Sequence, residues 1–166
     1  DSVAALNYIA ARPDQQGVPL VAFGQSLGGA LSLAALGESG THGVRGLAVE
    51  STFYSYQGVA QWHAANIWWL WLVQWPVSHW LVTDDHSPSH SLANLKGLPL
   101  LVIHGDADQV VPYSQGEMLF RHAPEPKRFI SVPGGSHCGG TGGFRLQETE
   151  RYRQELLRFF DECVAG

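Results

Sequence analysis

The sequence predicts an α/β domain built on a parallel β-sheet. Four short apolar segments of strand length alternate with segments of helical periodicity, and this alternation is typical of parallel strands joined by right-handed crossovers. Glycine-rich or acidic loops follow three of these segments, where a parallel sheet carries its ligand-facing residues. The expected strands are residues 18–23, 44–50, 98–104 and 128–132. With 166 residues the chain has the length of a single domain.

Helices are expected between and around these strands. At the start of the chain, Val3, Leu6 and Ile9 recur at helical spacing, and Pro13 ends the pattern. Further helices are expected over residues 29–36, 113–122 and 147–164, the last with an apolar face. Each expected helix except the first and the last therefore joins two strands.

The turn after the first strand contains a G-x-S-x-G pentapeptide, formed by Gly24, Ser26 and Gly28. A strand, a sharp turn at the serine and a helix form the setting of a nucleophile elbow. We expect a Cβ atom at Gly24 or Gly28 to collide with the neighbouring strand and helix. The start of the helix also stabilises negative charge beside the serine. Taken alone, the pentapeptide favours the nucleophile elbow, and an ordinary glycine-rich turn is the alternative.

Two later loops supply the partners that a serine nucleophile needs. The strand 98–104 ends in an acidic turn that contains Asp108, and the strand 128–132 ends in a glycine-rich loop that contains His137. A serine hydroxyl becomes a good nucleophile when an imidazole takes its proton, and a carboxylate fixes the tautomer of that imidazole. The order along the chain is serine, aspartate, histidine.

With these three motifs the chain resembles the α/β-hydrolases over essentially all of its length. It is most similar to small serine hydrolases with a G-x-S-L-G-G elbow, an H-G-x-x-D-x-x-V-P acid loop and a G-x-H loop. Among these it leans towards the membrane-associated subgroup that includes depalmitoylating thioesterases. The resemblance implies that Ser26 is the nucleophile, Asp108 the acid, His137 the base and the Leu27 N–H an oxyanion donor. It implies neither a cofactor nor a metal ion.

The resemblance begins partway through the family's fold. We therefore expect residues 1–166 to form a partial α/β-hydrolase domain whose N-terminal strands are missing. The loop that supplies the family's second oxyanion N–H lies among those strands, so these residues alone are expected to be a poor esterase. The open edge of the first strand is expected to pair with the missing N-terminal part or with another chain.

An aromatic segment follows the second strand. All six tryptophans lie within residues 53–82, which contain no Asp, Glu, Lys or Arg. The resemblance implies that an insertion over about residues 53–95 forms a lid, and an apolar lid suits an acyl chain. The expected substrate-binding residues are Trp62, Trp68, Trp69 and Trp71. The alternative is that these rings pack the lid onto the body without touching substrate.

The same segment bears on membrane contact. Polar residues and a proline interrupt the apolar run between residues 74 and 79, so a membrane-spanning helix is not expected. Contact with a membrane surface fits better, since tryptophan favours that interface.

Other titratable residues have competing interpretations. Glu50 ends the second strand, where some hydrolases carry their acid, but the loop motif favours Asp108. We expect His104 to hold its own loop together. His86 and His90 have a metal-binding spacing, but Pro88 between them argues against the helix that such a site needs.

Composition narrows the class of function. The net charge is -5 and there is no cluster of Lys and Arg, so nucleic-acid binding is not expected. The two cysteines, Cys138 and Cys163, give no disulfide framework. The sequence therefore predicts a serine hydrolase that cleaves a small-molecule or lipid-like ester or thioester. A peptidase of the same fold and a non-catalytic binding module are the alternatives.

Overall fold

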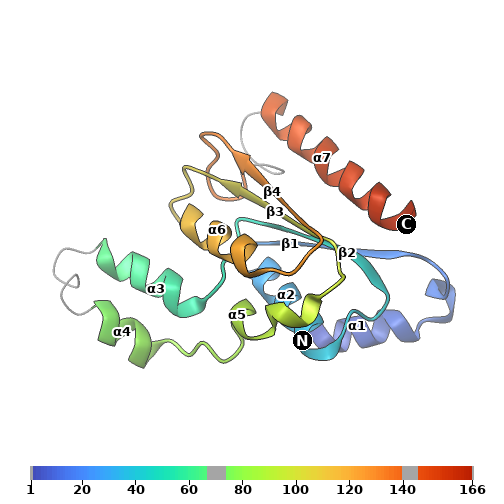
Figure 1. Ribbon diagram of the computed structural model, residues 1–166, viewed down its shortest axis with the longest axis horizontal. Helices are drawn as coiled ribbons and strands as arrows, with labels where there is room; N and C mark the ends of the chain where they lie inside the picture. The colour runs from blue at the N-terminus through green and yellow to red at the C-terminus, as the bar shows by residue number, and fades with distance from the viewer. Residues whose placement is uncertain (1, 67–73, 140–145, 166) are drawn as a thin grey trace.

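The computed structural model describes residues 2–66, 74–139 and 146–165 of the chain. A parallel sheet of four strands in the order β1-β2-β3-β4 forms its centre (Figure 1). Every neighbouring pair of these strands runs in the same direction. The strands are β1 (Leu20–Gln25), β2 (Val44–Glu50), β3 (Leu100–Gly105) and β4 (Lys127–Val132).

Helices pack on both faces of this sheet. The helices α2 (Leu27–Ser39) and α6 (Tyr113–His122) cover one face, and α7 (Leu146–Ala165) covers the other (Figure 1). Every residue of β3 is buried, because alternate side chains point to opposite faces and both faces are covered. Val102 lies in the core under α2 and α6, and Ile103 lies in the core under α7.

The remaining helices lie before and after the first two strands. The helix α1 (Ser2–Ala11) packs against α2, and a short 3-10 helix, η1 (Pro13–Gln15), follows it. The helices α3 (Tyr56–Ala65) and α4 (Gln74–Leu81) lie side by side, away from the sheet (Figure 1). Two short helices, α5 (Pro88–Ser91) and η2 (Leu92–Leu95), lead back to the sheet.

The expected strands form, with shifts of one or two residues at the ends of three of them. The first strand begins at Leu20 and not at residue 18, and the third begins at Leu100 and not at residue 98. In both cases a proline, Pro19 or Pro99, directly precedes the strand. Proline has no N–H to donate to a sheet, so regular pairing starts after it.

The strand β1 differs from its neighbours because it lies at the edge of the described sheet. Leu20 and Ala22 pack against the core under α2, whereas Val21 and Phe23 are 37% and 41% exposed. Alternation along a strand places these two exposed side chains on the opposite face. This apolar side of β1 is thus only partly covered by the described residues.

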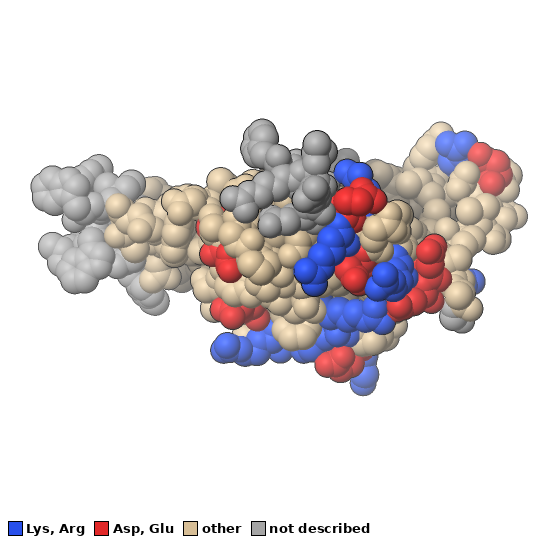
Figure 2. All heavy atoms as spheres, turned by 90° about the horizontal axis from the view of Figure 1, so that it is seen from above, with Lys and Arg blue, Asp and Glu red and all other residues tan. Residues whose placement is uncertain are grey.

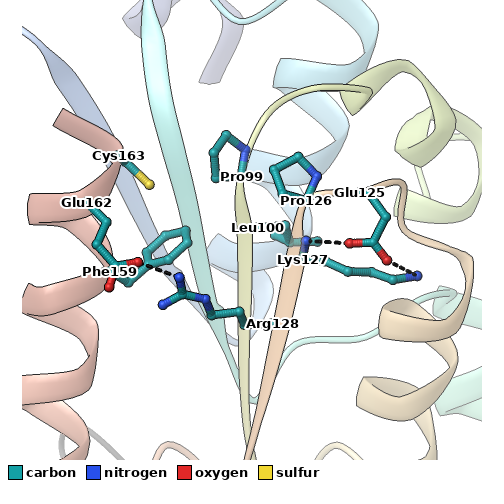
Figure 3. A pocket seen from close by; sticks show the side chains of 9 residues that line it. All are labelled: Pro99, Leu100, Glu125, Pro126, Lys127, Arg128, Phe159, Glu162 and Cys163. Carbon is teal, nitrogen blue, oxygen red and sulfur yellow. Dashed lines mark hydrogen bonds and ion pairs between the residues drawn. The ribbon is translucent and has the colours of Figure 1, made fainter. Parts of the chain in front are cut away.

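A cavity of about 230 Å³ lies at the amino ends of β3 and β4, where Leu100 and Lys127 begin the two strands (Figure 3). Pro99, Pro126 and Phe159 contribute apolar lining, and Arg128 and Glu162 form an ion pair beside it. Because parallel strands place their loops for ligand binding at the carboxyl ends, this cavity lies at the opposite end of the sheet from the predicted triad.

The surface carries charges of both signs. Basic and acidic side chains are interleaved on the face shown in Figure 2. On α7, Arg153 pairs with Glu150 and Arg158 pairs with Glu155. Among the helices of residues 2–66, 74–139 and 146–165, none combines the length and the apolar character that a membrane-spanning segment requires.

Candidate active site

Ser26 lies in the turn between β1 and α2, with φ of 51° and ψ of -124°. A positive φ is uncommon for a residue with a side chain and costs energy unless the surroundings hold it. Its N–H donates to the carbonyl oxygen of Glu50 at 2.8 Å, and its own carbonyl accepts from the Thr52 hydroxyl at 2.7 Å. Both backbone polar groups of the serine are therefore fixed by the residues that end β2.

Of the two glycines around Ser26 for which we expected a steric role, Gly24 has one and Gly28 does not. A Cβ atom at Gly24 would lie 2.6 Å from the Cα of Gly29, so Gly24 is required by the close approach of strand and helix. The expectation for Gly28 is wrong, because a Cβ there would meet nothing within 4 Å. Gly28 is exposed in the first turn of α2, and Gly29 takes the inward position instead. A Cβ at Gly29 would lie 2.9 Å from the Thr52 side chain.

Asp108 lies in the loop that follows β3 and is 6% exposed. Its Oδ1 accepts hydrogen bonds from the N–H groups of Val110 and Val111, at 2.8 and 2.9 Å. These bonds within the loop orient the carboxylate and leave Oδ2 for another donor. The local turn thus aims one oxygen of Asp108 away from its own loop.

His137 lies in the loop that follows β4 and connects the other two residues. Its Nδ1 lies 2.9 Å from Asp108 Oδ2, and its Nε2 lies 3.0 Å from Ser26 Oγ. An ionised carboxylate only accepts, so the proton of a neutral imidazole lies on Nδ1 and Nε2 is free to accept from the serine hydroxyl. The structure brings together three residues that the sequence separates by up to 111 positions.

Glu50 occupies a different place from Asp108. It is 1% exposed, and its Oε2 accepts from Gln25 Nε2 at 2.7 Å. The carboxylate beside His137 Nδ1 is that of Asp108, at 2.9 Å. Glu50 is instead bonded to the residue directly before Ser26.

Cys138 follows His137 but has the wrong chemistry for a nucleophile. Burial, with the nearby charges of Glu50 and Asp108, raises the pKa of the Cys138 thiol to about 11. The thiol therefore stays protonated near neutral pH, and the thiolate is the nucleophilic form. Its backbone N–H donates to the Ser51 hydroxyl at 2.8 Å.

His104 supports the acid loop from inside the core. It is fully buried, its Nε2 lies 3.0 Å from the Val111 carbonyl oxygen, and the same nitrogen lies 3.5 Å from Asp108 Oδ2. A carbonyl only accepts, so Nε2 carries the proton. Burial lowers the pKa of His104, and among the described residues its Nδ1 has no hydrogen-bond partner. The ring fits because Gly116 has no side chain: a Cβ there would lie 2.4 Å from Nδ1.

Of the four tryptophans expected to bind substrate, only Trp62 lies in the described part of the chain. It is half-buried on α3 and contacts the ring of His63 edge-on, with 4.9 Å between ring centroids. His63 Nε2 lies 2.8 Å from the Val110 carbonyl oxygen, so α3 touches the loop that carries Asp108. Trp68, Trp69 and Trp71 lie outside the described residues.

Two further elements of the site have no motif. Ser51 and Thr52 are fully buried and bonded to the histidine loop and to Ser26, and neither is among the site residues predicted from sequence. The available signal was their position directly after an expected strand at the ligand-facing edge.

Leu27, whose N–H was predicted to face an oxyanion, is the first residue of α2, where helix N–H groups lack intrahelical partners. Within the described ranges, no group of three His, Cys, Asp or Glu could hold a metal ion.

Comparisons with known proteins give the site its family context. The sequence matches the prolyl oligopeptidase family over residues 1–166. Over 159 residues it is 35% identical to the uncharacterized protein YfhR of Escherichia coli O157:H7. The aligned region covers 96% of this chain and 51% of YfhR. The chain spans about half the length of YfhR from this and other strains.

Solved structures share the fold. The α/β hydrolase MGS-MChE2, from a lagoon-sediment metagenome, superposes with a TM-score of 0.62 at 22% identity, over 96% of this chain and 70% of that one. A puromycin hydrolase mutant superposes with a TM-score of 0.72 at 17% identity, over 98% of this chain and 24% of that one. At these identities the similarity establishes the architecture and not the substrate.

Proposed function

Because the chain belongs to the prolyl oligopeptidase family of the α/β-hydrolase superfamily, we propose that it carries a serine hydrolase site that cleaves an ester or thioester. The observation that carries this proposal is the continuous line of hydrogen bonds from Asp108 through His137 to Ser26, at 2.9 and 3.0 Å. In this proposal Ser26 is the nucleophile, His137 the general base and acid, and Asp108 the residue that orients the imidazole.

In the first half-reaction, His137 Nε2 takes the Ser26 proton while Ser26 Oγ attacks the carbonyl carbon of the substrate. The carbonyl oxygen gains the negative charge, and the Leu27 N–H at the start of α2 stabilises it. The tetrahedral intermediate collapses, and His137 gives its proton to the leaving alcohol or thiol. The product of this half is an ester on Ser26.

In the second half-reaction, His137 takes a proton from water, and the resulting hydroxide attacks the ester on Ser26. Collapse of the second tetrahedral intermediate releases the carboxylic acid and returns the proton to Ser26 Oγ. Asp108 stays ionised throughout and stabilises the imidazolium that forms in each half.

An apolar acyl group is the substrate feature that we propose. The support is the tryptophan-rich segment 53–82, of which α3 contacts the acid loop through His63 and Val110. Trp62 lies on the same helix, half-buried, next to His63. Aromatic side chains supply large apolar contact area for a group such as an acyl chain.

A peptidase is the second candidate, and the family match favours it. The same triad attacks an amide, but the leaving amine then needs the proton from His137 before the bond breaks. A peptidyl p-nitroanilide, measured beside an acyl p-nitrophenyl ester or thioester, tests this candidate, because activated esters are cleaved readily by esterases and peptidases alike and only the anilide reports peptidase activity. A higher kcat/KM for the anilide would replace the ester proposal with the peptidase.

Labelling with a fluorophosphonate probe tests whether the site is catalytic. We expect the protein to be labelled and Ser26→Ala to lose both labelling and hydrolysis, whereas Ser39→Ala at the far end of α2 keeps both. An unlabelled full-length protein would instead support the third interpretation, a binding module with the same fold.

We also propose that another strand, from the missing N-terminal part of the fold or from another chain, pairs with the outer edge of β1. The support is the edge position of β1 and the exposed apolar side chains of Val21 and Phe23. Sedimentation tests this for residues 1–166: self-association or poor solubility is expected. A monodisperse, soluble monomer would contradict it.

A further inference from the structure

The last residue of β2 and the two residues after it are bonded to the turn of Ser26, to the histidine loop and to the strand that leads to the acid loop. Glu50, Ser51 and Thr52 are 1%, 0% and 0% exposed. Together they contact the turn of Ser26, the end of β3 and the histidine loop, and no substrate-facing role accounts for them. We refer to these three residues as the β2 clamp.

The clamp holds the nucleophile through its backbone. The Glu50 carbonyl accepts from the Ser26 N–H at 2.8 Å, and the Thr52 hydroxyl donates to the Ser26 carbonyl at 2.7 Å. A residue held at a φ of 51° persists there only when its surroundings over-determine it. These two bonds, one on each side of the serine Cα, supply such a constraint.

The clamp also holds the base and the strand that leads to the acid. The Ser51 N–H donates to the Ile103 carbonyl of β3 at 2.9 Å, and the Ser51 hydroxyl accepts from the Cys138 N–H at 2.8 Å. Cys138 directly follows His137, so this bond fixes the backbone next to the base. Ser51 and Cys138 both have positive φ, at 50° and 53°, and the bond joins two constrained turns.

We propose that Ser51 and Thr52 are positioning residues, which set the separation between Ser26 Oγ and His137 Nε2 without touching substrate. This inference rests on the proposed hydrolase function. The two atoms lie 3.0 Å apart, and they come from loops that follow different strands. A displacement of about 1 Å in such a pair can lower turnover about 100-fold, so a device that sets the separation has a large catalytic consequence.

Thr52 offers a matched pair of substitutions. Thr52→Val keeps the shape of the side chain and removes its donor to Ser26, whereas Thr52→Ser keeps the hydroxyl and removes a methyl group. We expect Thr52→Val to lower kcat and the rate of fluorophosphonate labelling about tenfold, with KM little changed. Thr52→Ser is expected to stay near the parent rate. If packing against Gly29 were the role of Thr52, the order of the two variants would be reversed.

Ser51 is tested against another buried serine. Ser51→Ala removes the acceptor for the Cys138 N–H, and we expect a similar tenfold fall in kcat and labelling. Ser91 is the control, because it is 2% exposed and its hydroxyl has no hydrogen-bond partner among the described residues. Ser91 lies against Gly37 of α2, away from the triad, so Ser91→Ala is expected to leave both rates unchanged.

Unfolding in urea, measured on the same proteins, separates positioning from loss of fold. Slower labelling of variants that are fully folded under the assay conditions supports the proposal. A labelled parent with Thr52→Val and Ser51→Ala labelled at the same rate would overturn the positioning role and leave the hydrolase standing. An unlabelled full-length parent would overturn both.

Discussion

The two ends of the same β-strands are built differently. At the carboxyl ends, Ser26, Asp108 and His137 are joined by hydrogen bonds. The buried β2 clamp is bonded to the turn of Ser26 and to the loop of His137. At the amino ends of β3 and β4 lies the cavity of Figure 3, with the ion pair of Arg128 and Glu162 beside it. The strand β3 links the two, since Leu100 lines the cavity and Gly105 leads into the acid loop.

This difference has an energetic meaning. A buried polar group that loses its partner costs the full desolvation of what remains, and its neighbours in a network lose support as well. An exposed ion pair is screened by water and salt and is worth little. Substitutions of equal chemical size should therefore have large effects at the carboxyl ends of the strands and small effects at the amino ends.

The largest effect is expected from the two carboxylates at the carboxyl ends. Asp108→Asn removes the charge that fixes the proton of His137 on Nδ1, and we expect kcat to fall about 10⁴-fold. Glu50→Gln keeps an acceptor for Gln25, and we expect it to lose less than about tenfold. Steady-state hydrolysis of a p-nitrophenyl ester measures both variants.

The same pair identifies the acid without reference to any motif. If Glu50→Gln lost more activity than Asp108→Asn, Glu50 would be the acid, and the 2.9 Å contact between His137 and Asp108 would have a structural meaning only.

The second effect concerns the two glycines of the turn. A Cβ at Gly24 would lie 2.6 Å from backbone atoms of α2, which cannot move aside as a side chain can. We expect Gly24→Ala to lower the free energy of unfolding by about 3 kcal/mol. Gly28→Ala meets open space in a helix, where alanine is preferred, and we expect a gain of up to about 1 kcal/mol. Urea unfolding of the two variants should therefore move in opposite directions.

The glycine pair shows what sequence could and could not predict. The pentapeptide identified the turn and its serine, because strand, turn and helix segments are readable from periodicity. It could not say which glycine faces the neighbouring helix, because that depends on how α2 enters the turn. The later starts of β1 and β3 are different, because the prolines that cause them, Pro19 and Pro99, are visible in the sequence and lack the N–H that strand pairing needs.

Dependence on the folded arrangement also explains why the residues of the β2 clamp could not be predicted from the sequence. Ser26, Asp108 and His137 lie in motifs with glycine or proline at fixed spacing, so the sequence placed them in the expected loops. Ser51 and Thr52 carry no such pattern, and their role depends on parallel pairing of β2 with β1 and β3, which is a property of the folded sheet. The tryptophan predictions at residues 68, 69 and 71 lie outside the described residues and stay predictions.

The third effect is a pH dependence from His104. Burial lowers the pKa of His104 below its ordinary value of 6.5, so the folded protein keeps this ring neutral. As pH falls below 6.5, His104 binds a proton in the unfolded chain but stays neutral in the folded chain. The stabilising contribution is therefore complete above pH 6.5 and is lost as pH falls towards the lower, folded pKa.

Urea unfolding at pH 7.5 and 5.5 measures this loss of stability. We expect the free energy of unfolding of the parent to fall more than that of His104→Gln over this interval, because the other histidines are common to both proteins. Gln also places an amide nitrogen near the position of Nε2, so the bond to the Val111 carbonyl has a substitute. Equal losses in the two proteins would mean that His104 takes up its proton in the folded state.

The smallest effect is expected at the amino ends of the strands. Arg128 and Glu162 form an ion pair, but their side chains are 57% and 46% exposed. We expect Arg128→Ala to lower the free energy of unfolding by less than about 1 kcal/mol and to leave kcat/KM unchanged. A double-mutant cycle with Glu162→Ala isolates the pair, and its coupling energy should shrink further at high salt. A coupling energy as large as the effect of Gly24→Ala, or a fall in kcat/KM, would show that the two ends of the sheet depend on each other.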